Sequence, residues 1–154
     1  MMSKYIRKSV LAYLAGIIDG EGCIRFDPDR TSTGKLTGTI VIMVNMLDPT
    51  IPLLFKEIFG GFYRVHTRRD FVTKADVHMW TSKAKKAGNV LERLIPFLII
   101  KKEQAKLALD VIEFKNSPRR RMKAPITKKE EAKYAEFYLK FKELNKRGER
   151  KAYA

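Results

Sequence analysis

An apolar helical segment that ends in two carboxylates separated by glycines is the feature that most constrains the fold of this sequence. Residues 14–22 read Leu-Ala-Gly-Ile-Ile-Asp-Gly-Glu-Gly. Apolar residues recur through residues 10–18 at the spacing of one helix face. The small residues Ala12, Ala15 and Gly16 form a neighbouring strip, along which the backbone of a second helix can approach closely.

The end of this helix has an unusual charge. Gly20 and Gly22 are predicted to stop the helix and to fix Asp19 and Glu21 at its C-terminal tip. A helix C-terminus carries partial negative charge, so acids there cost free energy unless a cation binds nearby. The segment therefore predicts a divalent-metal site, although an amphipathic core helix with a glycine-rich cap is the simpler alternative.

This nonapeptide resembles the LAGLIDADG motif of homing endonucleases, with Gly20-Glu21 in place of Ala-Asp. The resemblance implies that the motif helices of two half-enzymes pack side by side and deliver Glu21 to a metal held against the scissile phosphates. The carbonyl of Gly20 would be a second ligand, and the metal would be Mg²⁺, with Mn²⁺ or Ca²⁺ as substitutes. The interface between the helices would include Ala12, Ala15, Gly16 and Asp19.

Composition indicates a polyanionic partner. The chain has 154 residues, with 32 Lys and Arg against 17 Asp and Glu, which gives a formal net charge of +15. A hydrophobic content of 45% is enough for one domain with its own core. The single cysteine, Cys23, fits a reducing compartment, and no apolar run approaches membrane-span length. We expect a soluble intracellular protein, and the sequence does not distinguish an organelle from a prokaryotic cytoplasm.

Alternation and capping signals predict the remaining elements. Two hairpins are expected, each followed by a helix, and two further helices then end the chain. The expected ranges are strand 23–27, turn 28–34, strand 35–45, helix 48–59, strand 62–69, strand 75–81, a helix 83–94 capped by Ser82, helix 99–115, a basic loop and helix 127–145.

This order predicts an α+β fold in which helices cover one face of a four-stranded antiparallel sheet. It matches the LAGLIDADG fold, helix-strand-strand-helix-strand-strand-helix, over about residues 5–115. Residues 116–154 match only as a helical extension of the same domain. Arg25, Arg64 and Arg68 alternate along strands on the open face, which could lie in a DNA major groove.

Two further positions resemble catalytic residues of the family. Residues 96–105 look like its proline, apolar run and lysine before a late helix, which maps the active-site lysine onto Lys101. Such a lysine can stabilise charge that develops on a phosphate. A polar residue at the end of the second strand maps onto Asn45, in a register that leaves Met46 open.

The candidate nucleic-acid contacts are basic or polar residues of the strands, their turns and the basic loop. His66 lies on the arginine face, and neither it nor His78 has a partner at metal-ligand spacing. The candidates are Arg25, Asp27, Lys35, Thr37, Thr39, Arg64, His66, Arg68, Arg69, Arg120 and Lys123.

One copy of the motif indicates a homodimer, because cutting two strands needs two active sites. Strands of about 10 residues at roughly 3.4 Å per residue imply a site of about 20 base pairs for the dimer. We therefore expect an intron-encoded, Mg²⁺-dependent endonuclease that makes a staggered double-strand break at a pseudo-palindromic site. A group I intron RNA maturase and a catalytically inactive DNA-binding regulator are the alternatives, and Glu21 with Lys101 argues against the regulator.

Overall fold

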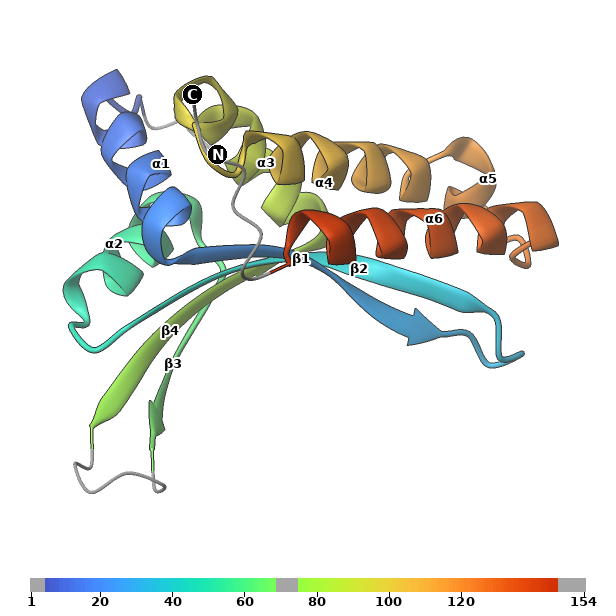
Figure 1. Cartoon of the computed structure of the whole chain (residues 1–154), viewed down its shortest axis with the longest axis horizontal. Helices are drawn as coiled ribbons and strands as arrows, with labels where there is room; N and C mark the ends of the chain where they lie inside the picture. Colours follow the sequence, from blue (N-terminus) through green and yellow to red (C-terminus); the bar gives the residue numbers. More distant parts are fainter. Residues whose placement is uncertain (1–4, 69–74, 147–154) are drawn as a thin grey trace.

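The chain folds into a curved antiparallel sheet with helices packed against one of its faces (Figure 1). The structure is a computed structural model and describes residues 5–68 and 75–146. The strands lie in the order β1-β2-β4-β3. The elements are α1 (Lys8–Glu21), β1 (Gly22–Arg30), β2 (Leu36–Met46), α2 (Thr50–Phe59), β3 (Phe62–Thr67), β4 (Asp76–Lys83), α3 (Ala84–Leu94), the 3-10 turn η1 (Ile95–Phe97), α4 (Lys102–Lys115), α5 (Pro118–Arg121) and α6 (Lys128–Leu144). The predicted α+β order is confirmed.

Alternation along the strands separates a buried face from an open one. Ile24 and Phe26 of β1 pair with Ile42 and Ile40 of β2, and all four side chains are buried under the helices. Trp80 of β4 is fully buried on the same face and donates from its indole to the carbonyl of Gly60 at 2.7 Å. Because side chains alternate between faces of a strand, the intervening residues lie on the opposite, helix-free face.

The first hairpin is longer than the alternation predicts. β1 continues through Pro28 to Arg30, so the turn begins at Thr31. Proline lacks an amide donor and is tolerated in a strand at a sheet edge, and β1 is an edge strand. The sequence therefore misplaced this strand end, because the sheet order that makes Pro28 acceptable is not visible in the sequence.

Ser82 does not cap a helix, contrary to the prediction. It belongs to β4 and is buried, and its Oγ has no hydrogen-bond partner within the described residues. The helix begins instead after Lys83, at Ala84, which has a positive φ of 52°. Backbone in this region is strained for a residue with a side chain, so packing on both sides must hold the abrupt change from strand to helix.

Helix α6 is part of the core, although the sequence analysis placed residues 116–154 outside the matching region. Its Tyr134, Phe137 and Phe141 are buried, and the rings of Tyr134 and Phe141 each lie 6.4 Å from that of Phe26 in β1. Aromatic rings bury large apolar areas, so this helix closes the end of the sheet that α1 and α3 leave uncovered (Figure 1). No helix in the described residues is long and apolar enough to cross a membrane.

Candidate active site and nucleic-acid interface

Helix α1 ends at Glu21, with Gly22 as its C-cap. Gly22 has φ −82° and ψ 162°, which is extended backbone and not the left-handed conformation in which glycine commonly ends a helix. A Cβ on Gly22 would instead lie 2.7 Å from Cα of Ile18 and 2.8 Å from its carbonyl oxygen. Glycine is required because the chain passes directly into β1 against the last turn of the helix, whereas Gly20 lies inside the helix.

Asp19 joins the end of α1 to the beginning of α4. Its carboxylate accepts hydrogen bonds from the backbone amides of Ile99, at 2.8 Å, and Lys101, at 2.9 Å. Lys101 is the N-cap residue of α4, so this acid lies at the positive end of the α4 dipole although it belongs to the last turn of α1. Asp19 was predicted to lie between the two motif helices of a dimer, but its carboxylate is bound within the chain.

The Lys101 side chain in turn contacts the main chain of Asp19. Its Nζ donates to the main-chain carbonyl of Asp19 at 2.6 Å. That carbonyl belongs to the last turn of α1, where backbone acceptors lack partners inside the helix and a cation is favourable. Lys101 therefore lies at the tip of the motif helix, although the two residues are far apart in the sequence.

Glu21 and the carbonyl of Gly20 are the metal-ligand candidates at this tip. Both residues are exposed, and the Glu21 carboxylate has no hydrogen bond or ion pair within residues 5–68 and 75–146. A carboxylate and a backbone carbonyl are oxygen ligands of the kind that Mg²⁺ and Ca²⁺ prefer, so the donor chemistry fits such an ion. Among the described residues, no group of three or more His, Cys, Asp or Glu is arranged to hold a metal.

Asn45 lies at the same end of the sheet. Gly22, which directly follows Glu21, pairs with Val44, which directly precedes Asn45. Asn45 is exposed on the open face, whereas Met46 pairs with His78 and packs against the core. Of these two residues, therefore, Asn45 is the one at which a polar side chain faces outward.

The open face of the sheet carries a set of polar and charged side chains. The strand register places on it Arg25, Asp27, Asp29, Thr37, Thr39, Asn45, Arg64, His66 and Lys83. The Arg25 guanidinium is bound to Asp27, with Nε and Oδ1 2.6 Å apart, and the hydrogen bond to this carboxylate raises the pKa of Arg25. Arg64 and His66 lie on the same face of β3 and are exposed.

Comparison with known proteins decides the family. DNA endonuclease I-CreI from Chlamydomonas reinhardtii is 31% identical to this chain over 113 residues, which are 73% of this chain and 68% of the relative. No family model matches the chain. The chain belongs to the LAGLIDADG homing endonuclease family.

Solved structures of LAGLIDADG proteins share the fold. The homing endonuclease I-CvuI, in complex with its target, superimposes with a TM-score of 0.67 over 94% of this chain and 87% of that one, at 23% identity. The archaeal intron-encoded homing endonuclease I-Vdi141I, complexed with DNA, gives a TM-score of 0.70 over 94% of this chain and 89% of that one, at 14% identity.

In this LAGLIDADG chain, the interface strip on α1 differs from the predicted one. Ala12 and Gly16 are exposed, but Ala15 is fully buried in the chain's own core. Ala15 therefore cannot contact a second motif helix, and its assignment to the interface is wrong. The exposed small residues recur at every fourth position, at Ala12, Gly16 and Gly20. Residues at this spacing lie on one face of a helix.

Several predicted DNA contacts have partners inside the chain. The Lys35 ammonium donates to the carbonyl of Ile126 at 2.5 Å. The Thr39 hydroxyl lies 3.2 Å from Nζ of Lys115, at the edge of β2 that has no neighbouring strand. Burial raises the pKa of the Tyr134 hydroxyl, and its interaction with the Thr37 side chain partly opposes this shift.

The predicted basic loop is partly helical. Residues Pro118–Arg121 form α5, and Arg120 is bonded to the carbonyl of Ala124 at 2.8 Å and to Glu130 at 3.4 Å. Lys123 follows with φ 55° and is exposed. Arg68 comes directly after β3, where its amide donates to the carbonyl of Ala75 at 3.3 Å, and Arg69 lies outside the described residues.

Two lysines near the sheet were missed in the sequence. Lys83 is exposed on the open face and pairs with Val41, itself paired with Arg25, but it had been assigned to a helix. Lys115 is half-buried against the edge of β2, and its Nζ donates to the carbonyl of Gly38 at 2.5 Å. Burial lowers the pKa of Lys115. Strand alternation through residue 83 could have revealed Lys83, whereas nothing in the sequence pairs Lys115 with β2.

Proposed function

We propose that this chain is a site-specific DNA endonuclease that makes a staggered double-strand break at a long pseudo-palindromic site. The observation that carries the proposal is the exposed carboxylate of Glu21, without an intramolecular partner in the described residues, at a helix tip shared with Lys101. Strand β1, which contributes side chains to the open face, begins at Gly22 directly after Glu21. A cutting centre thus adjoins a recognition surface.

Glu21 and the carbonyl of Gly20 would hold a divalent ion, with Mg²⁺ as the physiological metal. When bound, such an ion polarises a phosphodiester and stabilises charge on the leaving oxygen. Mg²⁺ sites commonly use one or two carboxylates and complete their coordination with substrate phosphates and water. The relative I-CvuI was crystallised on DNA in the presence of 2 mM Ca and of 2 mM Mg, which supports this ion class.

The neighbouring side chains would act on the phosphate and on the attacking water. The Lys101 ammonium can place positive charge beside the phosphoryl oxygens, where negative charge develops in the transition state. Asn45 can hold a water molecule by donating or accepting through its amide. The hydrogen bond from Lys101 to the Asp19 carbonyl, and the pairing of Gly22 with the residue before Asn45, support these roles.

A homodimer would supply the second active site. The chain contains one copy of the motif, and a two-fold axis along the exposed strip of Ala12 and Gly16 would bring two Glu21 carboxylates together. A Cβ added at Gly16 meets nothing within 4 Å in the single chain, so this surface is open to a second helix. The two sheets would then cover about 20 base pairs.

Cleavage of a randomised duplex library with Mg²⁺, followed by sequencing of the cut ends, tests the proposal. We expect cuts at one pseudo-palindromic sequence with a fixed stagger, and none when EDTA replaces Mg²⁺. Splicing of a group I intron without any DNA cleavage would instead identify a maturase. Sequence-specific binding without either activity would identify a regulator.

A further inference from the structure

The tip of the first hairpin is not held by the rest of the sheet. β2 pairs with β4 only from Val41 to Met46, so residues 36–40 have a strand neighbour on one side only. The hairpin diverges from β3 and β4 and passes beneath α6 (Figure 1). A two-stranded ribbon alone is marginally stable in water, so contacts from another element must fix the tip.

Two hydrogen bonds join the hairpin tip to the loop before α6 and to the first turn of α6. The Lys35 ammonium donates to the carbonyl of Ile126 at 2.5 Å, and the backbone amide of Leu36 donates to Oε1 of Glu131 at 3.0 Å. These contacts connect residues more than 90 positions apart in the chain. One contact uses a side chain of the hairpin and the other uses its main chain. Together they fix the position of the tip relative to the start of α6.

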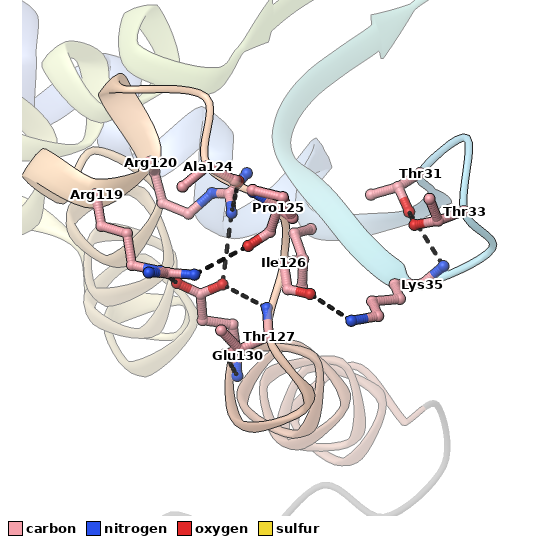
Figure 2. Close-up of polar contacts among 10 residues, drawn as sticks. All are labelled: Thr31, Thr33, Lys35, Arg119, Arg120, Ala124, Pro125, Ile126, Thr127 and Glu130. Atoms are coloured by element: carbon pink, nitrogen blue, oxygen red, sulfur yellow. Dashed lines mark hydrogen bonds and ion pairs between the residues drawn. The ribbon is translucent and has the colours of Figure 1, made fainter.

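Glu130 holds the loop that presents the Ile126 carbonyl (Figure 2). Its Oε2 accepts from the amide of Thr127 at 2.8 Å, and its Oε1 is 3.0 Å from Nε of Arg119. The bond from the Thr127 amide, followed by the bond to Arg119, lowers the pKa of Glu130. The side chains of Arg120 and Glu130 are only 18% and 13% exposed, which favours a structural role for this pair.

The two arginines also hold the loop by its main chain. Arg119 donates to the carbonyl of Pro125 at 3.1 Å, and Arg120 donates to the carbonyl of Ala124 at 2.8 Å (Figure 2). The carbonyl of Ile126 is next in the chain, so the arginines and Glu130 together set where it points. We call residues 118–131 with these contacts the α5–α6 corner.

We propose that the α5–α6 corner positions the tip of the first hairpin for DNA recognition, and that Lys35 and Glu131 are positioning residues. This inference rests on the proposed endonuclease function. β1 spans nine residues from Gly22 to Arg30, about 30 Å at roughly 3.4 Å per residue, so the tip lies far from Glu21. It would face the base pairs at the outer end of each half-site. Lys35 would act by holding the tip and would not neutralise a phosphate.

Specificity profiles of four variants of the full chain test this role. Lys35→Met and Glu131→Met each remove one contact, and Lys35→Arg keeps a donor and should rescue. Lys129→Met is the matched control, because Lys129 is exposed on α6 and loses the same charge without touching the tip. In library cleavage, the first two variants should lower base preference at the outermost positions of each half-site about fivefold or more. Preference next to the cuts should stay unchanged, and Lys129→Met should match the wild type.

The salt dependence of binding separates a positioning lysine from a phosphate contact. With DNA carrying the selected site, the slope of log affinity against log salt should be the same for Lys35→Met and the wild type. Removal of a phosphate contact reduces the slope by about 0.9. A reduced slope with a uniform loss of affinity for all sequences would overturn the proposal.

Amide hydrogen exchange in the protein without DNA tests the contacts independently of nuclease activity. We expect faster exchange at Leu36 in Lys35→Met and Glu131→Met than in Lys129→Met. Unchanged exchange in both variants would overturn the positioning role even if cleavage occurs. If the wild type cut no library member, the proposed function would fail, while faster exchange would still support the corner as the element that holds the tip.

Discussion

Lys101 and Asp19 hold each other through opposite groups: the Lys101 ammonium donates to the Asp19 carbonyl at 2.6 Å, and the Asp19 carboxylate accepts the Lys101 amide at 2.9 Å. This residue pair thus places a positive charge at the C-terminus of α1 and a negative charge at the start of α4, and each charge compensates the helix dipole there. Of the two acids in the motif, Asp19 is bound within the fold. Glu21 has no such contact in the described residues, so its carboxylate is available to the metal ion that we propose.

Glu21→Gln should abolish cleavage and leave specific DNA binding nearly unchanged, because an amide cannot supply the negative charge that a divalent ion requires. Cleavage rates and fluorescence anisotropy with the selected site measure the two properties. Glu92→Gln, at an exposed position of α3, is the matched control and should remain active. A Glu21→Gln enzyme that still cuts would exclude this carboxylate as the metal ligand.

Lys101→Met should lower kcat about 10²- to 10³-fold, the usual cost of removing one donor that stabilises transition-state charge. Asp19→Asn should mainly reduce the free energy of unfolding, by about 1–3 kcal/mol, because a charged acceptor of two amides is lost. Single-turnover kinetics and urea denaturation distinguish the two effects. Equal losses of stability with full activity in both variants would leave Lys101 a purely structural role.

Gly16→Leu should weaken the dimer by about 1–3 kcal/mol through overpacking between two helices. The monomer should tolerate the change, since a Cβ at this position meets nothing within 4 Å. Sedimentation over a range of concentrations measures the dimer, and Ala132→Leu at an exposed site on α6 is the control. An unaltered dimer would mean that the chains associate through another surface.

Arg64→Ala should relax base preference at one position per half-site, mirrored by the two-fold symmetry, because arginine can read guanine with two hydrogen bonds worth about 1–3 kcal/mol. Lys123→Ala should weaken binding to all sequences and flatten its salt dependence. Cut-site sequencing and salt titrations compare the two variants. Identical profiles would show that Arg64 also contacts phosphate.

The hydrogen bond from the Thr127 amide to Glu130, together with the ion pairs of Glu130, should make stability depend on pH. The folded pKa lies below the ordinary value of 4.5, so the stabilisation is complete above pH 4.5 and disappears as the pH falls through the lowered folded value. The stability difference between the wild type and Glu130→Gln should therefore be constant near neutrality and shrink under acid. Urea denaturation at several pH values from about 7 to about 3 measures this difference. A difference independent of pH would contradict the assignment.

The sequence by itself determined the elements and the motif. Strand alternation identified the buried Ile24 and Phe26, and the acids and glycines after an apolar helix identified the helix tip that we propose as the metal site. These features are local, because helix and strand periods and capping residues act over a few neighbouring positions. Lys101 and Asn45 came from family resemblance, since nothing local links them to Glu21.

The tertiary structure decided which side chains are available. Ala15 belongs to the core and Lys35 bonds to Ile126, because α6 and the other helices pack over residues that look exposed in the sequence. The Asp19 carboxylate accepts hydrogen bonds from backbone amides at the start of α4, about 80 residues away in the sequence. Whether a charged or small residue is bound inside the chain or offered to DNA depends on which distant segment packs beside it, and local sequence periodicity carries no information about that segment.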